Sequence, residues 1–193
     1  MPPELQLVLA SASPRRAELL TSAGYVFVVE PADVDESVLH GEPAETYALR
    51  VAREKVRAVA TRQSSECLVL GADTVVVVGT ELLGKPVDTA DATRMLHRLS
   101  GAVHDVLTAV VVAGRAGELS EVVRTRVRFV ELTAADIAWY VESGEPAGKA
   151  GAYAIQGRAA RFIDRIEGSW SNVVGLPVAT VARLLAEAQR VVS

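Results

Sequence analysis

Residues 68–78 read LVLGADTVVVV and form the most apolar stretch of the chain. The β-branched valines predict a buried strand, because such side chains pack well on a pleated sheet. The stretch contains a single ionisable residue, Asp73, within Gly71-Ala72-Asp73-Thr74. A carboxylate there is costly to bury unless it is paired, bound to a metal or exposed at a cleft. Asp73 could therefore ligate a hard divalent cation or accept a proton from water. The structural alternative is an Asp that caps a bulge at Gly71; we favour the functional interpretation.

Strand and helix patterns alternate on both sides of this stretch, and at least one hairpin interrupts the alternation. The pattern predicts an α/β fold with a mixed sheet rather than a purely parallel one. The expected strands are residues 5–10, 25–30, 68–78, 81–83, 103–113, 119–132, 152–155 and 162–166. The expected helices are residues 15–23, 44–62, 88–101, 133–144 and 177–190, the first with Ser13 as its N-cap.

Size and composition indicate one globular domain. The chain has 193 residues, of which 50% are hydrophobic and 23% charged, a balance that can bury a core. Its net charge of −4 gives no general attraction for a nucleic-acid backbone. The single cysteine, Cys67, reads as a small buried hydrophobe rather than as a zinc ligand or nucleophile. His40, His97 and His104 show no metal-ligand spacing.

The N-terminal sequence has no targeting signal that we recognise. The first apolar run has no basic residues before it, as a signal peptide would. No apolar stretch reaches the length needed to span a bilayer. We therefore expect a cytoplasmic protein with neither a membrane nor a nucleic acid as partner.

The sequence Ser11-Ala12-Ser13-Pro14-Arg15-Arg16 places a strand end, a turn and a helix start together. Free backbone N–H groups and the positive end of the helix dipole gather at such a point and suit a phosphate. Arg15 and Arg16 add bidentate donors. The alternative is an N-cap followed by two solvated arginines. The sequence is not a Walker A loop, because it lacks the glycines and the Lys-Ser/Thr pair.

Two lysines are further candidates for binding phosphate. Lys55 lies on an expected helix, where a solvated lysine is the default, and Lys85 lies in the turn Gly84-Lys85-Pro86. Together with Arg15 and Arg16 they would offer four cations to a polyphosphate.

Two other sets of polar residues could complete a site. Residues 149–157, KAGAYAIQG, combine small residues that permit close approach with Gln156, which can donate to and accept from a base edge. A tight strand between glycines is the structural alternative. Asp33, Asp35 and Glu36 could supply a second metal ligand.

Taken together, these clusters resemble the Maf family of nucleotide pyrophosphatases. The resemblance covers nearly the whole chain, with the motifs in the family order. The matching stretches are LASASPRRAELL, VAREKVRA, GADTVVVV, LGKPVD, LSGAVHDVLTAV, KAGAYAIQG and VVGLPVATVARLL.

The resemblance implies a mixed, twisted α/β sheet with flanking helices, similar to inosine triphosphate pyrophosphatases. It also implies a single domain over residues 1–193, with two lobes around a cleft. Family members cleave nucleoside triphosphates between the α and β phosphates and require a divalent cation such as Mg²⁺ or Mn²⁺. The implied roles are catalytic base for Asp73, metal binding for Glu36 with Asp73, triphosphate binding for Ser11, Arg16, Lys55 and Lys85, and substrate sorting for Arg15, Thr74 and Gln156.

Arg15, Thr74 and Gln156 stand at the positions that distinguish the subfamilies, and there the sequence resembles the thymidine/uridine type. Methylguanosine-type members carry Trp at the position of Arg15 and a Ser-Glu-Gly ending at 155–157. We therefore expect dTTP and UTP, or modified pyrimidine triphosphates, as substrates. The alternatives are another base specificity, such as 7-methyl-GTP or ITP, and a regulatory role in septum formation and cell division. The oligomeric state stays open, with a homodimer as one candidate.

Overall fold

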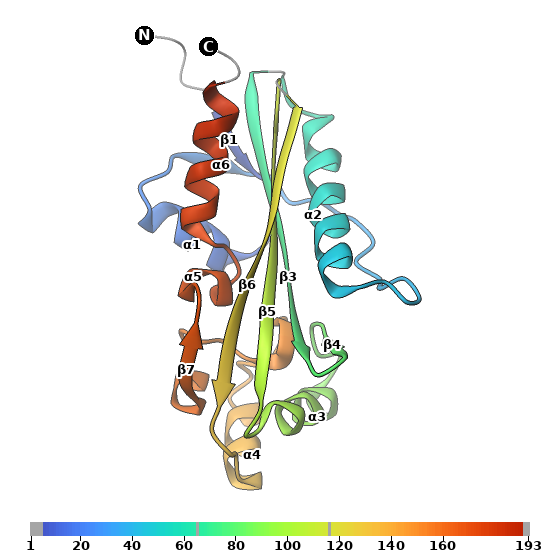
Figure 1. Ribbon diagram of the computed structural model, residues 1–193, viewed down its shortest axis with the longest axis vertical. Coiled ribbons are helices and arrows are strands. Elements are labelled where there is room, and N and C mark those ends of the chain that lie inside the picture. The colour runs from blue at the N-terminus through green and yellow to red at the C-terminus, as the bar shows by residue number, and fades with distance from the viewer. Residues whose placement is uncertain (1–5, 65, 116, 191–193) are drawn as a thin grey trace. The chain divides into compact units, whose positions relative to one another are not determined.

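A seven-stranded mixed sheet organises the part of the chain that the computed structural model describes, residues 6–64, 66–115 and 117–190 (Figure 1). The strand order is β2-β1-β3-β5-β6-β7, and β4 also pairs with β3. The strands are β1 (Gln6–Leu9), β2 (Phe27–Val29), β3 (Cys67–Val78), β4 (Glu81–Leu83), β5 (Val103–Gly114), β6 (Gly117–Phe129) and β7 (Ile163–Glu167). The α-helices are α1 (Pro14–Ser22), α2 (Ala44–Ala60), α3 (Thr89–Leu99), α4 (Ala134–Glu142), α5 (Trp170–Val174) and α6 (Val178–Arg190), with 3₁₀ turns η1 (Ala150–Ala152) and η2 (Arg158–Phe162).

Parallel and antiparallel pairing both occur in this sheet, which confirms the predicted mixed α/β class. Strand β1 pairs in parallel with β2 and with β3. The hairpin partner β4 runs antiparallel to β3, and β7 runs antiparallel to β6. Parallel neighbours need a crossover, and helices α1 and α2 supply the two crossovers that connect β1, β2 and β3.

The chain divides into two compact units. The first unit comprises residues 1–73, 108–123 and 175–193, and the second comprises residues 74–107 and 124–174. Strands β3, β5 and β6 each contribute residues to both units. Within the described residues, no helix combines the length and the apolar character that crossing a membrane requires.

The core of the first unit depends on the alternation of side chains along β3. Leu68, Leu70 and Ala72 are buried in one apolar cluster with residues of α1 and α6. In Figure 1, α1 and α6 lie on one side of this part of the sheet and α2 lies on the other. Successive residues of a strand point to opposite faces, so Gly71 and Asp73 face α2.

Gly71 lets α2 approach the sheet closely. A Cβ atom at Gly71 would lie 2.5 Å from Val56 Cγ2 and 3.1 Å from the Ala52 carbonyl oxygen. Strand β3 is continuous from Cys67 to Val78 across this glycine. The glycine serves the packing between helix and strand.

The second unit contains a cluster of aromatic rings in edge-on contact. The centroid of the Phe129 ring lies 5.1 Å from the centroid of the His104 ring and 5.0 Å from that of the Tyr153 ring. His104 Nε2 and the Tyr153 hydroxyl share a hydrogen bond of 2.8 Å. Burial lowers the pKa of His104 to about 4, so the ring is neutral at neutral pH. His104 is therefore part of the packed interior of this unit.

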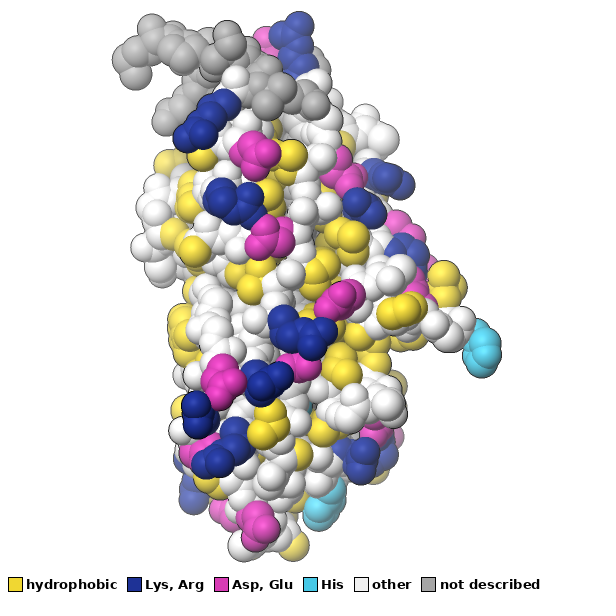
Figure 2. All heavy atoms as spheres, in the orientation of Figure 1, with side chains coloured by type: hydrophobic (Ala, Val, Ile, Leu, Met, Phe, Trp, Pro, Cys, Tyr) yellow, Lys and Arg dark blue, Asp and Glu magenta, His cyan; other side chains and the backbone are white. Residues whose placement is uncertain are grey.

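One face of β6 is exposed to solvent and the other is buried. Thr125, Val127 and Phe129 are buried, whereas the arginines between them are exposed. These arginines pair with acidic neighbours; for example, Arg128 forms an ion pair with Asp164. Figure 2 shows basic and acidic side chains interspersed over this part of the surface.

The strand predicted at residues 152–155 is wrong. These residues form no strand, because η1 occupies Ala150–Ala152 and the backbone of Gly151 and Ala152 is left-handed. The N-cap predicted for the first helix is confirmed: Ser13 stands at the N-cap of α1, although its side chain makes no capping hydrogen bond. The expected strand residue Leu5 lies outside the described residues.

We predict that Gly71→Ala lowers the free energy of unfolding by about 1–3 kcal/mol, the usual range for overpacking a core. Urea denaturation measures the change. Gly84→Ala is the matched control, because a Cβ atom there meets nothing within 4 Å. Equal stability of the two variants would show that α2 shifts freely.

Candidate active site

Arg16 is held at the start of α1 by two hydrogen bonds. Its Nη1 donates to Ser11 Oγ over 3.1 Å, and its Nε donates to the carbonyl oxygen of Gly175 over 2.8 Å. Only 8% of Arg16 is exposed. Burial lowers the pKa of the guanidinium, and the negative charge of Asp73 partly offsets that shift. The structure therefore excludes a solvated Arg16 and joins this residue to Ser11.

Arg15 occupies a more open place on the same helix. It is half-buried, and burial lowers its pKa while the charge of Glu18 acts in the opposite direction. Adjacent positions on a helix point in different directions. The two arginines therefore have different surroundings, one fixed by partners and the other partly open to solvent.

The ammonium group of Lys55 joins two carboxylates. Lys55 Nζ lies 2.6 Å from Glu36 Oε1 and 2.7 Å from Asp73 Oδ1. Lys55 and Asp73 are 7% and 6% exposed. The default expectation of a solvated lysine at position 55 is therefore wrong. Helix α2, strand β3 and the loop before α2 each supply one member of this cluster.

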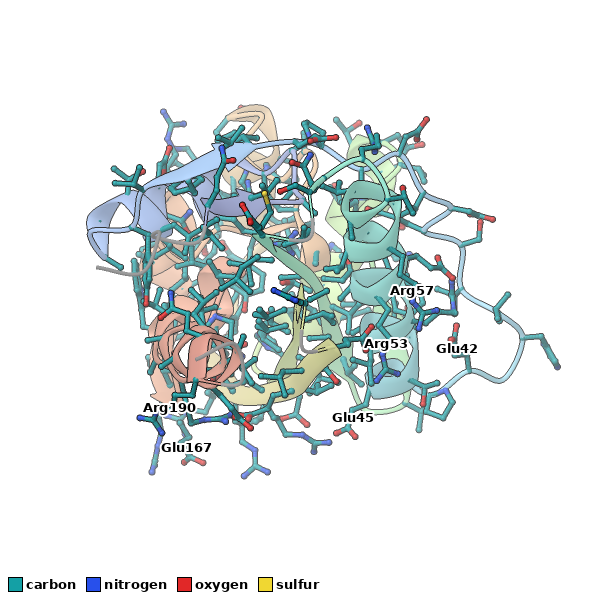
Figure 3. All side chains as sticks on the ribbon, turned by 90° about the horizontal axis from the view of Figure 1, so that it is seen from above. Glu42, Glu45, Arg53, Arg57, Glu167 and Arg190 are labelled. Carbon is teal, nitrogen blue, oxygen red and sulfur yellow. The ribbon has the colours of Figure 1, made fainter. Side chains whose placement is uncertain are left out.

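The loop that carries Glu36 is fixed to α2 by side chains that the sequence did not single out. The Tyr47 hydroxyl donates to the carbonyl oxygen of Glu36 over 2.8 Å, and Arg50 Nη2 donates to the carbonyl oxygen of Ser37 over 2.8 Å. Arg50 also pairs with Glu42, which lies in the loop beside α2 (Figure 3). Burial, with the nearby charges of Asp73 and Glu36, raises the pKa of Tyr47 to about 12. Tyr47 thus stays protonated as a donor.

Other cations of α2 make ion pairs nearer the surface. Arg53 and Arg57 lie on the same side of the helix (Figure 3), and both pair with Glu118. Their side chains are 38% and 71% exposed. Lys55 differs from them in its burial, which comes from its position opposite Asp73. Lys55 follows Tyr47 by eight residues, close to two helical turns. This spacing is the signal in the sequence that could have placed both residues on the same side of α2.

The acidic residues of the loop before α2 are not equivalent. Asp33 and Asp35 are exposed, and Asp35 accepts hydrogen bonds from Ser37, which lower its pKa. Glu36 is the acid of this loop that shares Lys55 with Asp73. Across the described ranges, no three or more His, Cys, Asp and Glu side chains form a group that could hold a metal.

Three predicted site residues belong to the second unit. Thr74 follows Asp73 on β3 and is part-buried, whereas Lys85 and Gln156 are exposed. The Lys85 turn lies against η1, because the Gly84 carbonyl oxygen accepts a hydrogen bond of 3.0 Å from Gly151 N. Gln156 follows η1 in the chain. The structure thus brings Ser11 to Arg16, and Glu36 and Asp73 to Lys55, in the first unit.

Comparison with known proteins identifies the family. Residues 6–188 match the family model described as Maf-like protein, and the chain belongs to the Maf family. This confirms the resemblance found in the sequence.

Relatives in three bacteria carry the name dTTP/UTP pyrophosphatase. The protein of Anaeromyxobacter dehalogenans (strain 2CP-1 / ATCC BAA-258) is 56% identical over 187 residues, which cover 95% of this chain and 94% of the relative. That of Myxococcus xanthus (strain DK1622) is 54% identical over 182 residues, which cover 94% of this chain and 92% of the relative. That of Hahella chejuensis (strain KCTC 2396) is 50% identical over 188 residues, 96% and 94% of the two chains.

We predict that Lys55→Met lowers the free energy of unfolding by about 3 kcal/mol, because it leaves two carboxylates without their shared cation. The expected value is near the lower end for buried pairs, since 34% of the Glu36 side chain is exposed. Lys85→Met is the control, because Lys85 is exposed. Chemical denaturation compares the two; parental stability in Lys55→Met would contradict the described cluster.

Proposed function

We propose that this protein hydrolyses dTTP and UTP to the nucleoside monophosphate and pyrophosphate. The observation that carries the proposal is the cluster of Glu36, Lys55 and Asp73, in which Lys55 and Asp73 are buried and which supplies two carboxylates and an ammonium group. The names of the relatives give the reaction and the bases.

The reaction needs little covalent chemistry from the protein. The oxygen of a water molecule attacks the α-phosphorus, the bond from this phosphorus to the oxygen bridging the α and β phosphates breaks, and pyrophosphate leaves. Such transfers depend on neutralising charge and on positioning the attacking water. Asp73 can accept the proton of that water at its carboxylate or share a cation with the substrate. In both roles its negative charge is essential.

A divalent cation, Mg²⁺ or Mn²⁺, fits the donor set. Mg²⁺ is usually held by one or two carboxylates together with substrate phosphates rather than by a cage of protein ligands. Glu36 and Asp73 offer two carboxylates that meet at one ammonium group. They are the residues that would hold the cation, which would neutralise phosphate charge and lower the pKa of bound water.

The basic residues would bind the triphosphate. Arg16 keeps a fixed position through Ser11 and Gly175, so its guanidinium needs little reorganisation to meet an anion. Ser11, Lys55 and Lys85 complete this set in the proposal. Lys85, like Thr74 and Gln156, enters it through the family resemblance.

We expect Asp73→Asn to reduce the rate of pyrophosphate release by roughly 10²–10⁴, the range for general acid–base groups. The amide oxygen can still accept a hydrogen bond from Lys55, so the fold is retained. Asp33→Asn is the control, because Asp33 is an exposed acid of the loop that carries Glu36. Product analysis separates pyrophosphate from orthophosphate. A parent enzyme that released orthophosphate and a nucleoside diphosphate would disprove the reaction, and full activity in Asp73→Asn would disprove the role of Asp73.

Base selection in the proposal rests on Arg15, Thr74 and Gln156. The O2, N3 and O4 edge of thymine or uracil presents an acceptor, a donor and an acceptor. Gln156 can answer with one donor and one acceptor, whereas cytosine reverses the pattern at N3 and at the exocyclic group. A methylated guanine carries a positive charge, which Arg15 would repel.

We expect dTTP and UTP to be hydrolysed with a kcat/KM well above that for CTP, GTP and 7-methyl-GTP. Discrimination by factors on the order of 10⁴ is attainable where a site is built around hydrogen bonds. The measurement is kcat/KM for all five substrates with one enzyme preparation. A preference for 7-methyl-GTP over both dTTP and UTP would overturn the base assignment and leave the reaction standing.

A further inference from the structure

The carboxylate of Glu145 holds the backbone on the C-terminal side of Gln156. Its Oε2 accepts a hydrogen bond of 3.0 Å from Arg158 N, and its Oε1 accepts a longer one of 3.4 Å from Ala159 N. These amides open the 3₁₀ turn η2, Arg158–Phe162. Glu145 therefore caps this turn in the way an acidic residue caps a helix start.

Tyr140 extends the same network to the N-terminal side of Gln156. Its hydroxyl donates to Glu145 Oε1 over 2.8 Å and accepts a hydrogen bond of 3.1 Å from Ala154 N. Tyr140 is fully buried on α4. Burial, followed by the bond to Glu145, raises the pKa of the Tyr140 hydroxyl well above its usual value, so it remains a donor. The backbone is thus anchored two residues before and two residues after Gln156.

Gly157 makes room for this arrangement. A Cβ atom at Gly157 would lie 2.4–2.5 Å from the carboxylate atoms of Glu145, closer than a real side chain can come. Gly157 N also donates to the Ala154 carbonyl oxygen over 3.0 Å and closes a tight turn around Gln156. The position after Gln156 is therefore fitted to the Glu145 carboxylate.

The backbone before Gln156 carries strain that its surroundings must maintain. Ala152 has a φ of 59°, a left-handed conformation that a residue with a side chain rarely adopts. Its neighbour Gly151 lies against Val76, where a Cβ atom would come within 2.8 Å of Val76 Cγ2. A segment held in this way presents the exposed side chain of Gln156 from a fixed backbone.

We infer that Glu145, acting with Tyr140, is a positioning residue for base selection: it fixes the backbone from which Gln156 reads the pyrimidine. The inference rests on the proposed function, because it takes Gln156 as the group that contacts the base. The Glu145 carboxylate accepts hydrogen bonds from Arg158 N, Ala159 N and the Tyr140 hydroxyl. In this inference it does not contact the base itself, and it acts by holding the backbone that carries Gln156. Poor positioning weakens hydrogen bonds to the correct base and removes the penalty for the wrong one.

The test is a double-mutant cycle on the ratio of kcat/KM for dTTP to that for CTP. The variants are Glu145→Gln, Gln156→Ala and the double variant, with Glu142→Gln as control because Glu142 is an exposed acid on α4. We expect Glu145→Gln to lower the ratio about tenfold, the equivalent of one hydrogen bond. In the Gln156→Ala background the same change should leave the ratio unaltered, since the group through which it acts is missing.

Each other result has a definite meaning. The inference is overturned if Glu145→Gln leaves the ratio unchanged, as it would if kcat/KM fell equally for dTTP and CTP. It is also overturned if Glu145→Gln lowers the ratio as much in the Gln156→Ala background as in the parent. If Gln156→Ala itself leaves the ratio unchanged, the failure belongs to the proposed base reading. Thermal unfolding checks every variant. Should Glu145→Gln unfold, Tyr140→Phe takes its place in the cycle, because it removes the hydroxyl that joins Glu145 to Ala154 and keeps the buried ring.

Discussion

The sharing of one ammonium group by two carboxylates is the interaction on which the first unit depends. Glu36 and Asp73 lie close to each other only because Lys55 Nζ lies between them, since two acids in a largely buried place would otherwise repel each other. The arrangement requires α2 to lie close to β3, which Gly71 permits. It also requires the loop before α2 to return to the helix, where Tyr47 holds it. The contacts of Lys55 with the two carboxylates therefore depend on the close packing of α2 against β3.

Arg16 shows how a cation can be prepared for an anionic ligand. A free arginine loses rotamer freedom when it binds, and that loss weakens binding. Here the partners Ser11 and Gly175 have already fixed the side chain, and burial has already removed most of its water. Arg15, half-buried on the same helix, keeps more of its freedom. The structure therefore distinguishes two adjacent arginines that look alike in the sequence.

The sequence predicted those features that depend on local patterns. The helix start after Ser13 and the hairpin that interrupts the alternation of strands and helices each involve residues a few positions apart, and the structure contains both. Local patterns did not predict the features that depend on distant partners. The residues around Lys55 on α2 give no hint of its contacts with Asp73 and Glu36, and only the family resemblance placed these three residues in one site. The strand expected at 152–155 is absent, because Gly151 and Ala152 have left-handed backbone.

The alternation of side chains between the two faces of β3 constrains how this chain can change over evolution. Ala72 belongs to the face that packs on α1 and α6, whereas Asp73 belongs to the face toward α2. Inserting or deleting one residue between Cys67 and Asp73 would exchange the two faces. The carboxylate would then enter an apolar core, and the residue opposite Lys55 would be Ala72 after an insertion or Thr74 after a deletion. Loops of this protein can vary in length, but the distance along the chain from the start of β3 to Asp73 can change only in steps of two.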